Sequence, residues 1–443
     1  MDTPVDLEQL TREYQDHVRW LTDRYDEALR ATGHDGVIVH SGSPRPRSIF
    51  DDQFWPMRAT PHFQHWLPLV TAHSALVIEP GKTPKLLWNR ELGFWEDPAP
   101  PETDHFWSAF DVVELTEAAK LKDHLPSPGA GRYAMITEDF DDADAWGVPS
   151  ELRNPDDLKA RLDDLRTVKT AYETTCLREA NRRACLGHAR VMEEFRRGDL
   201  SELQLHLLYL EATEQDDPET PYKNIVALGE HAATLHHVSY SRRREGAQSL
   251  LLDAGARYQG YESDITRTGV KGAGAATDVF SGLIDRMESL QKETCARVRT
   301  GLNYQSLHDQ SHELLAPVLR DLGIANGSDA ELVDTGITRT FLPHGLGHSL
   351  GLQTHDVGCR NVDPDPRNPF LRNTRDIEPK QCFTIEPGCY FIKSLLDDLR
   401  AKPEGTLIDW TLVDELTKFG GVRIEDDLVV EEGGVENLTR EYL

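Results

Sequence analysis

Four carboxylates attached to short apolar runs most constrain how the second half of this chain folds. Asp253 ends the run "SLLLD", and Asp264 begins "DITRTG" eleven residues later. Glu386 ends the run "CFTIE", and Glu425 lies inside "GGVRIEDDLVV". An apolar strand that ends in a carboxylate is unusual unless that charge is paired. A fold that gathers these strand ends must therefore also bring positive charge to them.

Each of these motifs has an ordinary explanation when it is taken alone. Asp253 and Asp264 would then only cap the turns of a hairpin. The run "GGVRIEDDLVV" alternates like a half-exposed strand, with Arg423, Glu425 and Asp427 on its polar face. Taken together, the four carboxylates carry about four negative charges, which two divalent cations would balance. A pair of such ions activates a water molecule for hydrolysis.

The stretch "LPHGLGHSLGLQTHD", residues 342–356, adds His344, His348 and His355 among three glycines. Read alone, it predicts a metal held by imidazoles, a substrate site or a turn. A site with mostly oxygen ligands and one imidazole favours Mn²⁺ or Co²⁺ over a zinc site built from thiolates. The six cysteines form no C-x-x-C pair, so we expect them to be reduced and buried.

These motifs, in the order Asp, Asp, His, Glu, Glu, resemble the pita-bread metallopeptidases. "PYKNIVALGEHAATLHH" and "DDQFWPMRATPHFQHWLP" extend the similarity to bacterial prolidases, the Xaa-Pro dipeptidases, including the organophosphorus acid anhydrolases. The resemblance implies a homodimer with two divalent ions per subunit, and we expect Mn²⁺ rather than Co²⁺ or Zn²⁺. It implies the metal ligands Asp253, Asp264, His348, Glu386 and Glu425.

The resemblance also implies roles in catalysis. Glu386 is expected to be the general base as well as a ligand, and His344 and His355 are expected at the substrate. His355, close to the ions, would stabilise the oxyanion. Arg423 lies two residues before Glu425 on the same strand face, so we expect it to hold a ligand carboxylate in place.

A dipeptidase for C-terminal proline needs a cation for the free carboxylate. Arg372, fourteen residues before Glu386, matches the prolidase arginine that has this role, and His236 matches a histidine on the same side. His237, its neighbour, is the alternative register. Tyr222 and Asp52 are weaker candidates for the substrate pocket, and in the family the region of Asp52 can come from a second subunit.

Charge and hydrophobicity restrict which binding partners and which fold class we expect. A net charge of −28 over 443 residues disfavours binding to nucleic acid or to anionic membranes. The chain shows no apolar run that would span a bilayer. Its acidic start predicts no secretory signal, so we expect a cytoplasmic location. We expect an α+β protein, with an N-terminal α/β creatinase-like domain at 1–157 and a pita-bread catalytic domain at 158–443.

Three alternatives follow from the same residues. Aminopeptidase P, which cleaves longer Xaa-Pro peptides, is the nearest alternative, and Arg372 argues against it. Hydrolysis of organophosphates is expected only as a side reaction of the same site. A non-catalytic binding protein on this fold would characteristically have lost ligands, whereas all five are present here. The segments "GEH" (229–231) and "SYSRRREGAQ" (239–248, with three arginines) depart from the family and receive no role.

Overall fold

The computed structural model describes residues 5–91, 94, 101–127, 130–244 and 246–443. The chain divides into two compact units, residues 1–175 and 176–443. We expected a boundary near residue 157, and the division falls further along, within helix α5 (Ala171–Arg197). Residues 156–197 form two helices, because α4 (Asp156–Leu165) ends before α5 begins at Ala171.

The first unit is the α/β domain that the alternating strands and helices predicted. Its five strands form one mixed sheet in the order β4-β3-β2-β1-β5, with β1 antiparallel to β2 and parallel to β5. The strands are β1 (Gly36–His40), β2 (Ala75–Ile78), β3 (Lys85–Asn89), β4 (Asp111–Leu115) and β5 (Tyr133–Ile136). The helices are α1 (Leu7–Thr32), α2 (Pro61–Gln64), α3 (Phe140–Ala145) and α4 (Asp156–Leu165).

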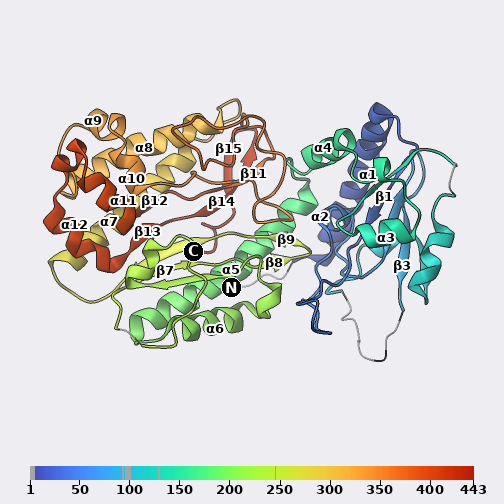
Figure 1. Cartoon of the computed structure of the whole chain (residues 1–443), viewed down its shortest axis with the longest axis horizontal. Coiled ribbons are helices and arrows are strands. Elements are labelled where there is room, and N and C mark those ends of the chain that lie inside the picture. Colours follow the sequence, from blue (N-terminus) through green and yellow to red (C-terminus); the bar gives the residue numbers. More distant parts are fainter. Residues whose placement is uncertain (1–4, 92–93, 95–100, 128–129, 245) are drawn as a thin grey trace. The chain divides into compact units, whose positions relative to one another are not determined.

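The second unit combines helices with several short antiparallel sheets, which confirms the expected α+β class (Figure 1). One sheet has the order β10-β7-β6 and another the order β11-β14-β15, while β12 pairs with β13 and β8 with β9. The strands are β6 (Ile225–Leu228), β7 (Ser249–Asp253), β8 (Arg257–Tyr258), β9 (Tyr261–Glu262), β10 (Thr266–Val270), β11 (Cys382–Ile385), β12 (Gly388–Tyr390), β13 (Gly421–Arg423), β14 (Asp426–Glu431) and β15 (Gly434–Asn437).

Helices cover these strands in Figure 1, with α5 and α6 along one side and α7 and α8 along the other. Besides α5, the helices are α6 (Glu202–Thr213), α7 (Ala275–Arg297), α8 (Tyr304–Asp321), α9 (Asp329–Asp334), α10 (Ile337–Phe341), α11 (Lys393–Arg400) and α12 (Trp410–Leu416). Ser201 caps α6 in a capping box with Gln204, which satisfies backbone N–H groups at the start of the helix.

The strand register brings the predicted carboxylates toward one another. In the antiparallel pair of β7 and β10, Thr266 lies opposite Asp253, so the chain returns Asp264 to the same end. Glu386 follows β11 directly, and an isolated bridge joins Glu425 to Thr266. The half-exposed strand expected at 421–431 is instead two strands, β13 and β14, whose residues are almost all buried, because both of their faces are covered.

Gly347 shows why the histidine stretch contains glycine. A Cβ atom at this position would collide with the carbonyl of Thr384 and the hydroxyl of Tyr304. The segment that carries His348 therefore packs directly on β11, which only glycine permits. Tyr304 is fully buried and donates its hydroxyl to Thr384 O at 2.8 Å.

Two expectations from composition can be compared with the structure. All six cysteines are buried, as expected. Among the described residues, no helix has the length and apolar character that a bilayer crossing demands.

Candidate active site

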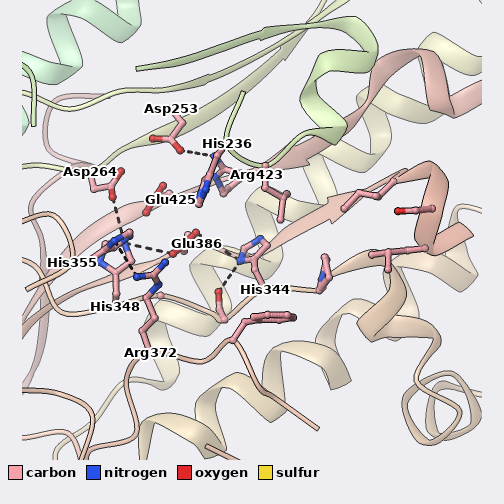
Figure 2. A pocket seen from close by; sticks show the side chains of 18 residues that line it. His236, Asp253, Asp264, His344, His348, His355, Arg372, Glu386, Arg423 and Glu425 are labelled. Carbon is pink, nitrogen blue, oxygen red and sulfur yellow. Dashed lines mark hydrogen bonds and ion pairs between the residues drawn. The ribbon is translucent and has the colours of Figure 1, made fainter. Parts of the chain in front are cut away.

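The predicted site residues of the second unit converge on one cavity of about 530 Å³. Figure 2 shows the labelled carboxylates gathered together, with Arg372 reaching toward them from the lower part of the view. Ten charged or histidine side chains line the cavity: His236, Asp253, Asp264, His344, His348, His355, Arg372, Glu386, Arg423 and Glu425. These are ten of the eleven predicted site residues of this unit, all except Tyr222, and they come from segments that are far apart in the sequence, so the fold creates the site.

The expected metal ligands lie at the centre of the cavity. Donor atoms of Asp264, His348 and Glu425 all lie within 4.8 Å of one another, and all three residues are buried. His348 Nε2 is 3.4 Å from Asp264 Oδ2 and 3.7 Å from Glu386 Oε1. His348 Nδ1 lies 3.1 Å from the carbonyl of Ser349, which can only accept, so Nδ1 carries the proton and Nε2 faces the carboxylates.

The cluster holds more negative charge than its own cations neutralise. Burial raises the pKa of Asp253 to about 6 despite the neighbouring Arg423. Burial also raises the pKa of Glu386 to about 7, and that of Glu425 well above its usual range, with the other carboxylates adding to both shifts. Burial alone would lower the pKa of His348, but Asp264 and Glu386 raise it to about 9.

These shifts are a physical test of whether divalent ions fit. Buried carboxylates keep protons at neutral pH when too little positive charge lies near them. For the same reason His348 holds a proton on Nε2, the nitrogen that faces these carboxylates. Two divalent ions would supply that charge, and the donor set of four carboxylates with one imidazole suits them. The residues therefore fit the metal centre that the sequence predicted.

Arg423 is the permanent cation beside this cluster. Its guanidinium donates to Asp253 Oδ2 at 2.5 Å, to the Tyr390 hydroxyl at 2.8 Å and, through Nε, to Thr266 Oγ1 at 3.0 Å. Thr266 donates its own hydroxyl to Glu425 Oε2 at 2.6 Å. Arg423 thus fixes one predicted ligand directly and another through a threonine, and all of these groups are buried.

His344 is held by protein groups at both ring nitrogens. Nδ1 lies 2.7 Å from the carbonyl of Gly345, so Nδ1 donates and Nε2 accepts. The Tyr390 hydroxyl lies 2.9 Å from Nε2 and donates to it, while accepting from Arg423. Burial, with Arg423 nearby, lowers the pKa of His344 to about 3, so the ring is neutral. Its Nδ1 is 3.8 Å from Glu386 Oε2.

Tyr390→Phe tests this chain of hydrogen bonds. The substitution leaves a buried donor of Arg423 and the Nε2 atom of His344 without a partner. We expect the free energy of unfolding to fall by about 1–3 kcal/mol. Urea titration followed by fluorescence measures the change, with Tyr442→Phe as the control, because Tyr442 is 36% exposed. Equal stability of the two variants would contradict the hydrogen-bond chain.

His355 has a different environment. Its Nδ1 lies 3.1 Å from Arg372 Nη1, and because a guanidinium only donates, this nitrogen accepts. Burial, His348 and Arg372 lower the pKa of His355 to about 3. The neutral ring therefore carries its proton on Nε2. It packs edge-on against His348, with 4.4 Å between the ring centroids.

The other predicted substrate residues differ in position. His236 lines the cavity, whereas His237 donates toward Glu202 at 3.0 Å, so the register that we preferred matches the geometry. Tyr222 is half-buried, and its hydroxyl donates to the cluster, 2.6 Å from Asp253 Oδ1 and 2.5 Å from Asp264 Oδ1. Tyr222 contacts carboxylates rather than the cavity. Asp52 is exposed and belongs to the first unit, so its role remains a prediction.

Sequence reasoning missed several residues that shape the site. Thr266 and Tyr390 connect the cluster as described above, and each is two to four residues from a predicted ligand, a proximity that was the only available signal. The apolar part of the cavity is formed by Leu235, Phe370, Ile392 and Leu395. Isolated apolar residues carry no signal for a pocket in a single sequence.

Comparison with known proteins places this geometry in a family. A model of metallopeptidase family M24 matches residues 175–432, and a model of the Xaa-Pro dipeptidase N-terminal domain matches residues 12–163. The Xaa-Pro dipeptidase of Shewanella pealeana is 39% identical over 98% of this chain and 99% of its own length. That of Shewanella woodyi is 40% identical with the same coverage.

Solved structures agree on the fold. Escherichia coli aminopeptidase P with the inhibitor Pro-Leu superposes with a TM-score of 0.73 at 23% identity, over 100% of this chain and 96% of that chain. Proline aminopeptidase P II from Yersinia pestis gives 0.72 at 23% identity, over 98% and 97%. These similarities identify the pita-bread fold.

Proposed function

Because the chain belongs to metallopeptidase family M24, among its bacterial Xaa-Pro dipeptidases, we propose that it hydrolyses dipeptides with a C-terminal proline. The observation that carries the proposal is one cavity that contains both the carboxylate cluster and two groups suited to a free carboxylate, Arg372 and His236. The cluster provides the chemistry, and the two basic side chains provide the selection for a dipeptide.

Five residues would hold the ions: Asp253, Asp264, His348, Glu386 and Glu425. When bound, two divalent ions supply the Lewis acidity that makes a water molecule nucleophilic near neutral pH. Asp253 and Glu425 are held in position by Arg423 and Thr266, and His348 is oriented by its bond to the Ser349 carbonyl. Such supporting bonds preserve the geometry and basicity of the ligands.

Glu386 is the group that moves the proton. It is 17% exposed at the cavity wall and has no arginine bonded to it, so one oxygen is available to an attacking water. We assign it the removal of that water's proton and its later delivery to the prolyl nitrogen. The prolyl nitrogen has no N–H in the substrate, so the enzyme must recognise ring shape and the carboxylate instead.

The hydrogen bonds of His344 and His355 assign the two histidines different roles. His355 keeps its Nε2–H for the oxygen of the scissile carbonyl, and we assign it oxyanion stabilisation, an effect of about 10²-fold or more. Both nitrogens of His344 are engaged by Gly345 and Tyr390. We therefore assign His344 to the wall that shapes the substrate site.

Arg372 is the proposed clamp for the proline carboxylate. One of its N–H groups is engaged by His355, which orients the guanidinium and leaves further donors for a bidentate contact. The apolar wall of Leu235, Phe370, Ile392 and Leu395 suits a pyrrolidine ring and a small N-terminal side chain. Turnover of Ala-Pro, Ala-Pro amide and Ala-Pro-Ala by the metal-loaded protein tests the assignment. Preference for the tripeptide would instead favour aminopeptidase P activity.

Several properties extend the proposal. The oxygen-rich donor set supports Mn²⁺ as the native ion, with Co²⁺ or Zn²⁺ as substitutes. The family supports a homodimer to which Asp52 contributes across the subunits, and the start of the sequence, which predicts no secretory signal, supports a cytoplasmic location. Organophosphate hydrolysis is proposed only as a side reaction, since the activated water attacks phosphorus in any ester that the cavity admits.

Metal removal should make stability depend on pH in a characteristic direction. The pKa values of Asp253, Glu386 and Glu425 are raised in the folded protein. Their contribution to the free energy of unfolding is therefore complete below about pH 4 and is lost as the pH rises through 6 to 7 and beyond. His348, with a pKa of about 9, loses its contribution between about pH 6.5 and 9.

We therefore expect the melting temperature of metal-free protein to fall from pH 5 to pH 8 relative to the Mn²⁺-loaded protein. At pH 8 the melting temperature of the Mn²⁺-loaded protein should exceed that of the metal-free protein by about 5 °C or more. Differential scanning fluorimetry on both forms at the same pH values measures it. A gap that stays constant or closes at pH 8 would contradict the electrostatic account of the cluster.

A further inference from the structure

A second cluster of metal-ligating side chains lies outside the cavity, around Glu202. This residue is the first of α6, and its side chain is fully buried. Its Oε1 accepts the backbone N–H of Leu228 at 3.0 Å, and its Oε2 accepts that of Ser241 at 2.7 Å. Burial would raise its pKa, but these hydrogen bonds and those of the neighbouring histidines lower it, so the carboxylate is ionised at neutral pH.

Two histidines converge on this carboxylate from the segment that follows β6. His231 Nδ1 lies 2.7 Å from Oε1, and His237 Nε2 lies 3.0 Å from Oε2. The two imidazole rings are stacked, with 4.5 Å between centroids and 23° between planes. The "GEH" segment and the start of "SYSRRREGAQ", which had no role in the sequence, thus meet at one buried carboxylate.

The donor set is one that proteins use for zinc. One ligand atom from each of Glu202, His231 and His237 lies within 4.8 Å of the others. Zinc bonds of about 2.0–2.2 Å to nitrogen and oxygen place neighbouring ligand atoms slightly over 3 Å apart, so these side chains would adjust their positions to close around an ion. His231 is 32% exposed, which gives an ion a path from solvent and leaves space for a water as fourth ligand.

We propose that Glu202, His231 and His237 form a further divalent-ion site for a borderline transition metal, represented by Zn²⁺. The ion would bind His231 Nδ1 and His237 Nε2 of neutral imidazoles, and the single proton of each ring would then lie on its other nitrogen. Glu202 keeps its two backbone hydrogen bonds. The site is separate from the five predicted ligands of the cavity, and the proposal does not depend on which peptide the protein cleaves.

The site bears on the cavity through the chain that connects its ligands. Residues 231–237 include Leu235 and His236, which both line the cavity. An ion that joins both ends of this segment to α6 holds that wall in one conformation. The site is therefore a positioning element for the wall, and its ligands do not touch the substrate.

The alternative to an ion site is a hydrogen-bonded cluster without an ion, in which both imidazoles donate to Glu202. X-ray data collected at the zinc edge from crystals of Mn²⁺-loaded protein, given one equivalent of Zn²⁺, distinguish the two. The proposal predicts an anomalous peak between Glu202, His231 and His237. Zinc found only at the carboxylate cluster of the cavity, or at neither position, would overturn it.

Metal analysis of variants gives a second readout in solution. After gel filtration of the same Mn²⁺-loaded, Zn²⁺-treated samples, the double variant His231→Asn, His237→Asn should retain at least tenfold less zinc at unchanged manganese. Asparagine keeps a donor toward Glu202 but is a poor zinc ligand. His124→Asn, which removes an exposed histidine, is the control and should retain zinc like the wild type. Equal zinc in all three proteins would reject the site. If the double variant does not fold, the anomalous map alone decides.

Discussion

Glu386→Gln is expected to abolish nearly all turnover while the metal stays bound. Glutamine keeps an oxygen for coordination but has no basicity, so it can neither accept the proton of the attacking water nor return it to the prolyl nitrogen. We expect kcat on Ala-Pro to fall by about 10³-fold or more. Stopped-flow or discontinuous assay of proline release measures kcat, and elemental analysis of the same sample measures the metal.

Asp427→Asn is the matched control for this substitution. Asp427 is a buried carboxylate near the cluster, where Oδ2 accepts the N–H of Asp264 at 3.1 Å and an N–H of Asn181 at 2.8 Å. Burial raises its pKa well above the usual range, so asparagine resembles its neutral form. The control should retain most of the activity. Near wild-type kcat in Glu386→Gln would refute its role as the base.

Arg372→Ala is expected to damage the selection for a free carboxylate. A charged hydrogen-bonding group contributes about 1.5–3 kcal/mol, so kcat/KM on Ala-Pro should fall by about 10- to 150-fold. Ala-Pro amide, which has no carboxylate, should lose much less. Arg372→Ala also removes the hydrogen bond to His355, which should affect both substrates. The difference between the losses of kcat/KM on the two substrates therefore isolates the contact with the carboxylate.

Two further variants sharpen this test. Arg372→Lys keeps the charge without the bidentate geometry and should give an intermediate loss on Ala-Pro. Arg367→Ala removes an exposed arginine that pairs with Asp365, and it should leave both substrates unchanged. Equal losses on Ala-Pro and its amide in Arg372→Ala would mean that the arginine does not read the carboxylate.

The sequence predicted the parts of this molecule that depend on local pattern. Strand ends at Asp253 and Glu386 follow from short apolar runs bounded by turn residues. The order of the carboxylates and the histidine stretch was sufficient to identify the family, because few folds combine them.

The rest depends on contacts between segments distant in sequence. Arg423 was placed beside a ligand on its own strand, yet it bonds to Asp253, which lies 170 positions earlier. Tyr222 was expected at the substrate, yet its hydroxyl points to two carboxylates of the cluster. Alternation predicts which side of a strand a residue occupies but not whether both sides are covered, so the burial of β13 and β14 was also missed.

The tautomers of His344 and His355 could not be predicted from the sequence either. Which of His344 and His355 keeps a free N–H depends on the partners of the other ring nitrogen, Gly345 and Arg372, and the spacing of the histidines does not encode those partners. The cluster at Glu202 depends likewise on the fold. Its three side chains span residues 202–237, and nothing in their spacing resembles a short metal-binding motif.

The central claim, a two-ion cluster that serves a dipeptide site, is tested most directly by metal reconstitution with paired substrates. Protein stripped by chelator is assayed on Ala-Pro and Ala-Pro-Ala, then again after titration with Mn²⁺, Co²⁺ or Zn²⁺. We expect no turnover before titration, and full recovery at about two ions per chain with Mn²⁺. Ala-Pro should be strongly preferred. Turnover by the stripped protein, or a preference for Ala-Pro-Ala, would contradict the account.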